Sequence, residues 1–277
     1  MLADLPFAEP ERAGPVSIHT LSVVIPTLNE ARNIEHVLGL LPDTVDEVIL
    51  VDGGSTDATV DIAREVRPGI RVLGQTRPGK GSALVTGILA ATGAEIVTID
   101  ADGSMDPREI DRFVAPLHAG ADYVRGSRFS PGGGSADITA VRFIGNKMLN
   151  ALANLLFGTS HSDLCYGFNA MTREAAWALH LPDPADGTRL RHWGDGFEIE
   201  TLMHVRAAKA NLRVVEVPSF EASRRFGESN LSAVRDGLRC LRTLLFERFV
   251  GASIASVVGT ERRTRAKVTA ELAGEGE

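Results

Sequence analysis

Cysteines and long apolar runs are both scarce in this chain, and each scarcity excludes a class of protein. Only two of the 277 residues are cysteines, Cys165 and Cys240. A disulfide scaffold and a cysteine-rich metal centre are therefore excluded, and a reducing cytoplasm is the expected location. No stretch reaches the roughly 18–20 apolar residues that span a bilayer, because the best candidate, 244–258, contains Glu247 and Arg248. Membrane contact, if any, is expected to be peripheral, at the inner face of the cell membrane.

A basic excess is also missing. The net charge is −7 at pH 7, which argues against a nucleic-acid partner bound by phosphate neutralisation. Residues 1–20 hold acids and prolines but no basic segment followed by an apolar run, so we interpret them as an N-terminal extension and not as a signal peptide. Residues 259–277 are charged and end near glycines, which predicts a disordered tail.

Short apolar segments alternate with helical patterns along the first half of the chain. This alternation predicts an α/β fold, with a mostly parallel sheet that carries helices on both faces. Ser55 is the expected N-cap of the second helix. The expected strands are 21–26, 47–52, 70–73, 96–99 and 122–125, and the expected helices are 30–41, 56–66 and 81–91.

Polar residues cluster where three of these strands end, at 27–30, 52–57 and 100–106. Ligands of open α/β sheets bind at the carboxyl ends of the strands, so we expect the clusters to share one site. In the second cluster, glycines allow a tight turn, and the Asp52 carboxylate is suited to accept hydrogen bonds from a ribose or a nucleobase. An ordinary strand–helix turn is the alternative.

Asp100 and Asp102 follow an apolar strand and stand one residue apart. In an extended chain alternate side chains point the same way, so both carboxylates are able to face one point. Two such charges need a shared cation or a set of donors. Mg²⁺ and Mn²⁺ suit this arrangement, since they bind through a few carboxylates together with substrate phosphates. A polar turn that closes the strand is the simpler alternative.

The segment 74–81 nearly matches a phosphate-binding P-loop. Gly81 stands where that motif requires Ser or Thr, and Pro78 interrupts the loop. A P-loop nucleotide hydrolase is therefore rejected. Lys80 remains a candidate for contact with a ligand, with a plain glycine loop as the alternative.

Charged residues in the second half offer further candidates. Arg128 follows a strand and Arg142 opens an expected helix at 142–157, and arginine suits bidentate phosphate binding, although lone arginines near loops are more often solvated. Asp195, Glu198 and Glu200 lie around the start of another expected helix, 198–208. They either complement the dipole of that helix or supply a general base.

The last expected helix, 231–249, carries an apolar stripe with arginines beside it. One interpretation is an amphipathic core helix with a solvated face, and the other is a basic helix that lies on an anionic membrane. Six arginines against three acids between residues 223 and 248 keep the membrane interpretation open. The stripe is Leu231, Val234, Leu238, Leu241, Leu245 and Phe249, and the arginines are Arg235, Arg239 and Arg242.

Five segments resemble, in their order, the motifs of family 2 glycosyltransferases of the GT-A fold. They are 24–30, 51–57, 79–81, 100–102 and 126–129. Within that family the chain resembles most the dolichol-phosphate mannose synthases and the bacterial polyprenyl-phosphate glycosyltransferases, with further similarity at 162–168 and 224–229. The resemblance implies a GT-A domain over 21–232 and a C-terminal amphipathic helix over 233–258.

The resemblance also implies which residues bind which group. Asp100, Asp102 and Ser104 would hold Mg²⁺ or Mn²⁺, with Asp102 as the more direct ligand and water in place of the Gln that relatives often have at Ser104. Arg128 and Arg142 would hold the acceptor or leaving phosphate, and Arg128, Asp195 and Glu198 are the catalytic candidates. The residues implied for the nucleotide sugar are Pro26, Thr27, Glu30, Asp52, Gly54, Lys80, Asp100, Ala101, Asp102, Arg224 and Ser229.

Some positions depart from the family pattern. Asn230 stands where relatives often have Lys, and Asn169 where they often have Arg, which removes two positive charges near the expected phosphate region. The transmembrane helices that many relatives carry after this domain are not expected here.

The expected reaction is metal-dependent, inverting transfer of a hexose from a GDP- or UDP-linked donor to a polyprenyl phosphate. A phosphate acceptor is already an anion and needs no strong base. The alternative acceptor is a hydroxyl of a soluble small molecule or saccharide, which needs a base, with Asp195 first and Glu198 second. A nucleotidyltransferase is disfavoured because no glycine-rich loop follows the first strand. An inactive binding module is disfavoured by the intact acidic pair and Arg128.

Overall fold

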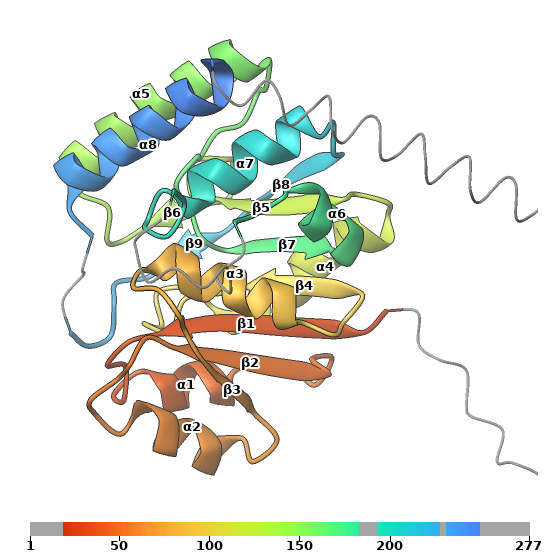
Figure 1. Ribbon diagram of the computed structural model, residues 1–277, viewed down its shortest axis with the longest axis vertical. Helices are drawn as coiled ribbons and strands as arrows, with labels where there is room; N and C mark the ends of the chain where they lie inside the picture. Colours follow the sequence, from red (N-terminus) through yellow and green to blue (C-terminus); the bar gives the residue numbers. More distant parts are fainter. Residues whose placement is uncertain (1–18, 183–192, 228–230, 250–277) are drawn as a thin grey trace, which may run out of the picture.

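The computed structural model describes residues 19–182, 193–227 and 231–249. Across these ranges a seven-stranded sheet with the order β3-β2-β1-β4-β7-β5-β8 forms the centre of the molecule (Figure 1). Its strands are β1 (Leu21–Thr27), β2 (Glu47–Asp52), β3 (Arg71–Gly74), β4 (Glu95–Thr98), β5 (Tyr123–Ser127), β7 (Asn169–Thr172) and β8 (Val214–Pro218). A small parallel sheet pairs β6 (Gly134–Ser135) with β9 (Phe220–Glu221).

The sheet is mostly parallel, which confirms the expected α/β class. β1 pairs in parallel with β2 and β4, and β2 pairs in parallel with β3. All five expected strands form, with bounds shifted by one or two residues at most of their ends. β7, which the sequence did not predict, lies antiparallel between β4 and β5.

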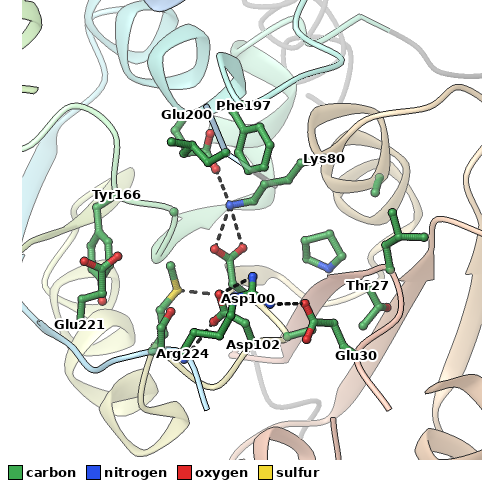
Figure 2. A pocket seen from close by; sticks show the side chains of 18 of the residues that line it. Thr27, Glu30, Lys80, Asp100, Asp102, Tyr166, Phe197, Glu200, Glu221 and Arg224 are labelled. Atoms are coloured by element: carbon green, nitrogen blue, oxygen red, sulfur yellow. Dashed lines mark hydrogen bonds and ion pairs between the residues drawn. The ribbon is translucent and has the colours of Figure 1, made fainter. Parts of the chain in front are cut away.

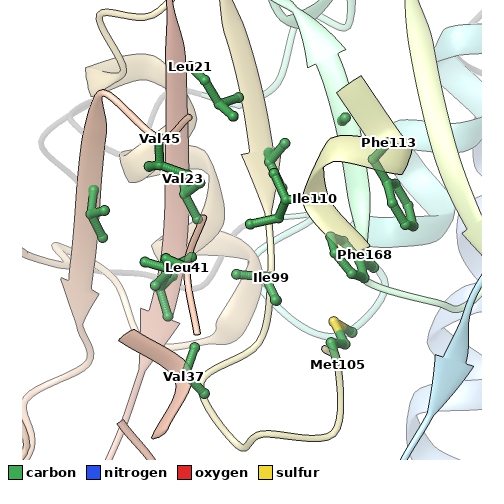
Figure 3. Close-up of a cluster of buried hydrophobic side chains, with 14 of the residues drawn as sticks. Leu21, Val23, Val37, Leu41, Val45, Ile99, Met105, Ile110, Phe113 and Phe168 are labelled. Atoms are coloured by element: carbon green, nitrogen blue, oxygen red, sulfur yellow. The ribbon is translucent and has the colours of Figure 1, made fainter. Parts of the chain in front are cut away.

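Alternation along the strands builds two cores, one on each face of the sheet. Val23 and Ile25 face one core and Val24 faces the other, as expected for strands buried on both sides. In the first core Phe113 stacks on Phe168 with ring centroids 4.0 Å apart (Figure 3). Helices on one face of the sheet complete the first core: α1 (Ile34–Gly39), α2 (Thr59–Val66) and α4 (Ile110–His118). A 3-10 turn, Pro107–Glu109, precedes α4. Helices on the other face complete the second core: α3 (Lys80–Ala90), α6 (Arg173–Ala178) and α7 (Ile199–Lys209).

Ser55 is not a helix cap, so that expectation was wrong. α2 begins three residues later than expected, at Thr59, and its N-cap residue Ala58 makes no side-chain cap. The cause is local, because the Asp52 carboxylate accepts the backbone N–H groups of Gly54 and Ser55 and so prolongs the turn. The helix α1 likewise starts at Ile34 and not at Glu30.

Two long helices lie side by side at the edge of the molecule farthest from α1 and α2 (Figure 1). They are α5 (Ala140–Phe157) and α8 (Ala233–Phe249), and both pack on α7 through a small cluster that includes Ala153, Val205 and Leu244. The expected extension 1–18, tail 259–277 and helix segment 250–258 fall outside the described residues. Within the described ranges, each helix is too short or too polar to cross a bilayer.

Candidate active site

A pocket of about 470 Å³ opens at the carboxyl ends of the parallel strands. Thr27 ends β1, Gly53 follows β2, Gln75 follows β3 and Asp100 follows β4, and all four line the pocket. The three polar clusters that the sequence places at strand ends therefore contribute to one site. This volume is of the size expected for a small-molecule or cofactor site.

The acidic pair lies at the centre of this pocket, where two cations hold it (Figure 2). Lys80 Nζ lies 2.8 Å from Asp100 Oδ1. Arg224 Nη2 lies 3.0 Å from Asp102 Oδ2, and its Nη1 lies 2.8 Å from Glu30 Oε1. The backbone N–H of Ser104 donates to Asp102 Oδ1 at 2.9 Å. Each carboxylate is thus fixed in direction by charge and hydrogen bonds from residues of the pocket itself.

The donor set at this point fits a divalent cation that is shared with a diphosphate. Asp100, Asp102 and Ser104 all line the pocket and offer only oxygen atoms, the donors that Mg²⁺ and Mn²⁺ prefer. Within the described part of the chain, no group of three or more His, Cys, Asp or Glu ligand atoms converges in this pocket. Two carboxylates without a full protein cage leave coordination positions for phosphate oxygens and water.

Lys80 connects the acidic pair to a third carboxylate, Glu200 of α7. Lys80 Nζ lies 2.8 Å from Glu200 Oε1 as well as from Asp100. Although burial opposes its charge, the two carboxylates raise the pKa of Lys80 above its ordinary value. Burial raises the pKa of Glu200, and Lys80 offsets only part of that rise. Glu200 lines the pocket, although the sequence pattern did not distinguish it from the two acids just before it, Asp195 and Glu198.

Asp195 does not line the pocket, in contrast to its expected role as a base. Its carboxylate forms a paired contact with the buried guanidinium of Arg77, at 2.9 Å and 3.0 Å. Its backbone carbonyl accepts the N–H groups of Gly81 and Ser82 at the start of α3. A Cβ on Gly81 would lie 1.8 Å from the Gly194 carbonyl oxygen, so only glycine fits there. The backbone N–H groups at the N-terminus of α3 are therefore already occupied by the Asp195 carbonyl. This explains why segment 74–81 is not a phosphate-binding P-loop.

Glu198 is also outside the pocket lining. It is buried, and its Oε1 accepts the backbone N–H of Gly196 at 3.2 Å. The helix α7 begins one residue later, at Ile199. Residues two positions apart on a helix point in different directions, so Glu200 faces the ligand space while Glu198 closes the preceding turn.

Arg128 lines the pocket but is already bound on three edges. Its Nε lies 2.7 Å from Asp163 Oδ2 and its Nη1 lies 3.1 Å from Glu221 Oε1. The guanidinium also lies over the ring of Tyr166, 4.9 Å from the centroid. Arg142, at the start of α5, is held by a single half-exposed carboxylate, Asp137, at 3.0 Å. Of the two expected phosphate ligands, Arg142 is the more available.

The remaining candidates divide into three groups. Pro26, Thr27, Glu30 and Ala101 line the pocket, as expected for a nucleotide-sugar site. Asp52 and Gly54 lie beside it, where the Asp52 carboxylate is used to hold the turn. Ser229 and Asn230 fall outside the described residues.

Comparison with known proteins identifies the family. Residues 22–179 match the family model "Glycosyl transferase family 2". This match covers more than half of the chain, so the protein belongs to glycosyl transferase family 2 and is a glycosyltransferase. Both the expected family and the expected GT-A fold are confirmed.

Named relatives and solved structures are similar over most of the chain. The polyprenol monophosphomannose synthase of Mycolicibacterium smegmatis is 31% identical over 76% of this chain and 80% of that protein. The undecaprenyl-phosphate mannosyltransferase of Micrococcus luteus is 32% identical over 76% and 86%. A structure of glucosyl-3-phosphoglycerate synthase from Mycobacterium tuberculosis, in complex with Mn²⁺, UDP and glucosyl-3-phosphoglycerate, aligns with a TM-score of 0.61 and 26% identity over 83% and 80%.

Proposed function

We propose that this glycosyltransferase moves a hexose from a GDP- or UDP-linked donor to a polyprenyl phosphate, with inversion at the anomeric carbon. The nucleotide sugar would lie along Thr27, Glu30 and the Asp100–Asp102 turn. A divalent cation at Asp100, Asp102 and Ser104 would neutralise charge on the leaving diphosphate. The similar synthase binds UDP with Mn²⁺ or Mg²⁺, and two similar proteins are named for mannosyl transfer to a polyprenyl or undecaprenyl phosphate.

The observation that supports the proposed acceptor is the distribution of side chains on α5 and α8, where polar residues are buried and several apolar residues are exposed. Both helices turn polar side chains inward: α5 buries Asn146 and Asn150, and α8 buries Asp236 and Glu247. Their exposed faces carry seven apolar side chains that are between 58% and 81% exposed, alongside exposed basic residues such as Lys147 and Arg242. Such a contiguous apolar face marks an interaction site for a lipid or protein partner. These side chains are Val141, Ile144, Met148 and Leu155 on α5 and Val234, Leu238 and Phe249 on α8.

This apolar face, the seven side chains just named, starts at the pocket. Arg142, in the first turn of α5, and Leu231, just before α8, both line the pocket. A ligand with an anionic head and an apolar tail would place its head beside Arg142 and its tail along the two helices. Polyprenyl phosphate has this chemistry, and its phosphate attacks without a protein base.

The arginines of α8 contribute less than their number indicates. Arg239 lies 3.0 Å and Arg235 3.4 Å from the buried Asp236 carboxylate, and Arg242 lies over the ring of Trp193. Since Asp236 offsets part of this charge, we infer that apolar contact, more than attraction to anionic lipid, would bring the enzyme to a membrane. The interpretation of the 231–249 stripe as a core-facing stripe was wrong, because Val234, Leu238 and Phe249 face outward.

Nucleoside diphosphate release tests the proposal. The full chain is assayed with a panel of GDP- and UDP-sugars and Mn²⁺ or Mg²⁺, with and without a short polyprenyl phosphate. We expect release that depends on the lipid and on the metal, with sugar label passing into the organic extract. Release that is the same without lipid, with label remaining in water, would refute the lipid acceptor. Pyrophosphate in place of nucleoside diphosphate would refute glycosyl transfer.

The alternative, transfer to a hydroxyl of a soluble acceptor, is favoured by one feature, the carboxylate of Glu200 inside the pocket. It would replace Asp195 as the candidate base. Glu200→Gln separates the two acceptors. A hydroxyl acceptor predicts a loss of about 10²–10⁴-fold in kcat, whereas a phosphate acceptor predicts a much smaller loss. Asp195→Asn, which weakens the contact to Arg77, is expected to lower stability and not to alter the pH profile of kcat.

A further inference from the structure

A second cluster of metal-binding side chains lies at the opposite end of the sheet from the pocket. His19 precedes β1, Glu95 is the first residue of β4 and His118 is the last residue of α4. One donor atom from each side chain lies within 4.8 Å of the other two. Across the described ranges, this is the one group of three or more His, Cys, Asp or Glu residues that meets this condition.

The distances suit a small cation bound by all three. Glu95 Oε1 lies 3.3 Å from His19 Nδ1 and 3.0 Å from His118 Nε2, and the two imidazole centroids are 4.2 Å apart. In a tetrahedral zinc site with bonds of about 2.0–2.2 Å, two donors lie roughly 3.3–3.6 Å apart. The two distances to Glu95 are close to this spacing, and all three donor atoms lie within 4.8 Å of one another.

The buried carboxylate of Glu95 lies between the two imidazoles. Among the described residues, its hydrogen bonds and ion pairs go to the two imidazoles. The guanidinium of Arg173 donates instead to the backbone carbonyl of Gly93, two residues before Glu95. A bound divalent cation would give this carboxylate a positive partner at the centre of the three side chains, and a buried carboxylate is stabilised by such pairing.

We propose that His19, Glu95 and His118 bind one Zn²⁺ ion as a structural site, separate from the catalytic pocket. Two imidazole nitrogens and one carboxylate oxygen suit zinc, whereas Mg²⁺ and Mn²⁺ prefer oxygen donors alone. The two imidazoles are about half exposed, at 49% and 44%, so an ion has access and a water can complete the shell. The ion would tie the start of β1 to β4 and α4.

The site cannot take part in sugar transfer. β1 has seven residues between His19 and the end of the strand that lines the pocket. At about 3.3 Å per residue this separates the cluster from the pocket by roughly 20 Å. The inference therefore stands whether or not the proposed acceptor is correct.

Zinc titration of the full-length protein tests the proposal. The protein is stripped with a chelator, dialysed and titrated with Zn²⁺ by calorimetry without nucleotide, and its thermal unfolding is followed at each zinc concentration. Wild type should bind one Zn²⁺ in the presence of excess Mg²⁺, and Tm should rise by roughly 5–10 °C at a concentration 100 times Kd. His19→Gln and His118→Gln should each weaken binding at least tenfold and remove the Tm rise.

Two control variants make the result specific. His180→Asn removes an exposed histidine at a positive φ of 46°, a conformation that asparagine tolerates, and zinc binding should be unchanged. Asp102→Ala should keep the zinc response and lose metal-dependent UDP binding. Equal zinc affinity in wild type and both cluster variants, or no zinc bound by wild type, would overturn the proposal.

Discussion

The two halves of the molecule use charge in opposite ways. From β1 to β4 the strands are packed in apolar cores, with Val24, Ile25 and Leu50 fully buried, and Lys80, Asp100 and Asp102 lie at the strand ends around the pocket. From β5 to α8 the charged groups lie inside. Arg128 is enclosed by Asp163 and Glu221, and Glu247 is buried between Arg206 and Lys209. Seven apolar side chains of α5 and α8 lie outside, while others such as Ala153 and Leu244 pack on α7.

This difference fits the proposal that the halves meet different partners. The first half presents polar groups to a polar ligand, a nucleotide sugar, from a conventional apolar core. In the second half, buried ion pairs fix the geometry of the helices while their apolar faces stay free for a partner. Buried pairs add little net stability but are costly to break, so the second half should respond more strongly to charge deletion in its interior.

The largest expected effect is on catalysis in the first half. Asp102→Ala should lower kcat/KM at least 10³-fold, because it removes a metal ligand and a charge that positions Arg224. Nucleoside diphosphate release measures the effect. Asp43→Ala, in an exposed loop before β2, is the matched control and should be neutral. Similar rates for both variants would remove Asp102 from the metal site.

The second effect is on stability in the second half. Arg128→Ala leaves Asp163 and Glu221 buried without a cation and should cost about 3–5 kcal/mol of unfolding free energy. Arg108→Ala removes an ion pair with Asp106 in which the arginine is largely exposed, and the unfolding free energy should hardly change because solvent screens this pair. Urea unfolding of both variants gives the comparison, and equal losses would mean that the buried contacts of Arg128 contribute no more to stability than a surface ion pair.

The third effect tests the apolar face of α5 and α8. Met148→Gln with Leu238→Gln should weaken binding to vesicles of phosphatidylethanolamine and phosphatidylglycerol by about 2–3 kcal/mol, or at least tenfold, since two apolar side chains leave the lipid. Leu89→Gln, at an exposed apolar position on α3, should leave vesicle binding unchanged. If the paired variant sediments with vesicles as wild type does, the face has another partner.

The smallest effect is a pH dependence of stability in the second half. Burial, together with nearby Arg125, lowers the pKa of His161 to about 4 from 6.5. The unfolded chain takes up a proton below pH 6.5 while the folded one does not, so stability is complete above pH 6.5 and falls as the pH drops toward 4. We expect about 1–2 kcal/mol of this fall to disappear in His161→Gln. His180→Asn should keep the wild-type curve, and an unchanged curve in His161→Gln would contradict the assignment.

The first half was predictable because its signals are local. The strands, the acidic pair and the polar turns all follow from short patterns at the ends of apolar segments, and the structure brings them into one pocket. Where the prediction failed, distant residues decided the outcome. Asp195 lies outside the pocket lining, where Arg77, more than 100 residues earlier in the chain, binds its carboxylate. Glu200 lines the pocket and Asp195 does not. Which acid faces the pocket depends on the residue at which α7 begins.

The second half gave weaker signals. β7 has only four residues and no clear alternation, so its antiparallel place in the sheet was not predicted. The apolar stripe on α8 was recognised, but a hydrophobic pattern gives the same signal for a core and for an outer docking face. The buried position of Asp236 and Glu247 on the other side of the helix decides between them.

Because α5 and α8 both begin at the pocket, the face that they form has a direction. The proposed acceptor would lie with its phosphate at the pocket and its isoprenoid tail along the helices. The length of the helices limits how much of the tail they contact. α8 has 17 residues, which at about 1.5 Å per residue gives a track of roughly 25 Å. If the acceptor is a polyprenyl phosphate, its affinity should therefore grow with each added isoprene unit until the length of the two helices is covered. Longer acceptors should then bind with the same affinity.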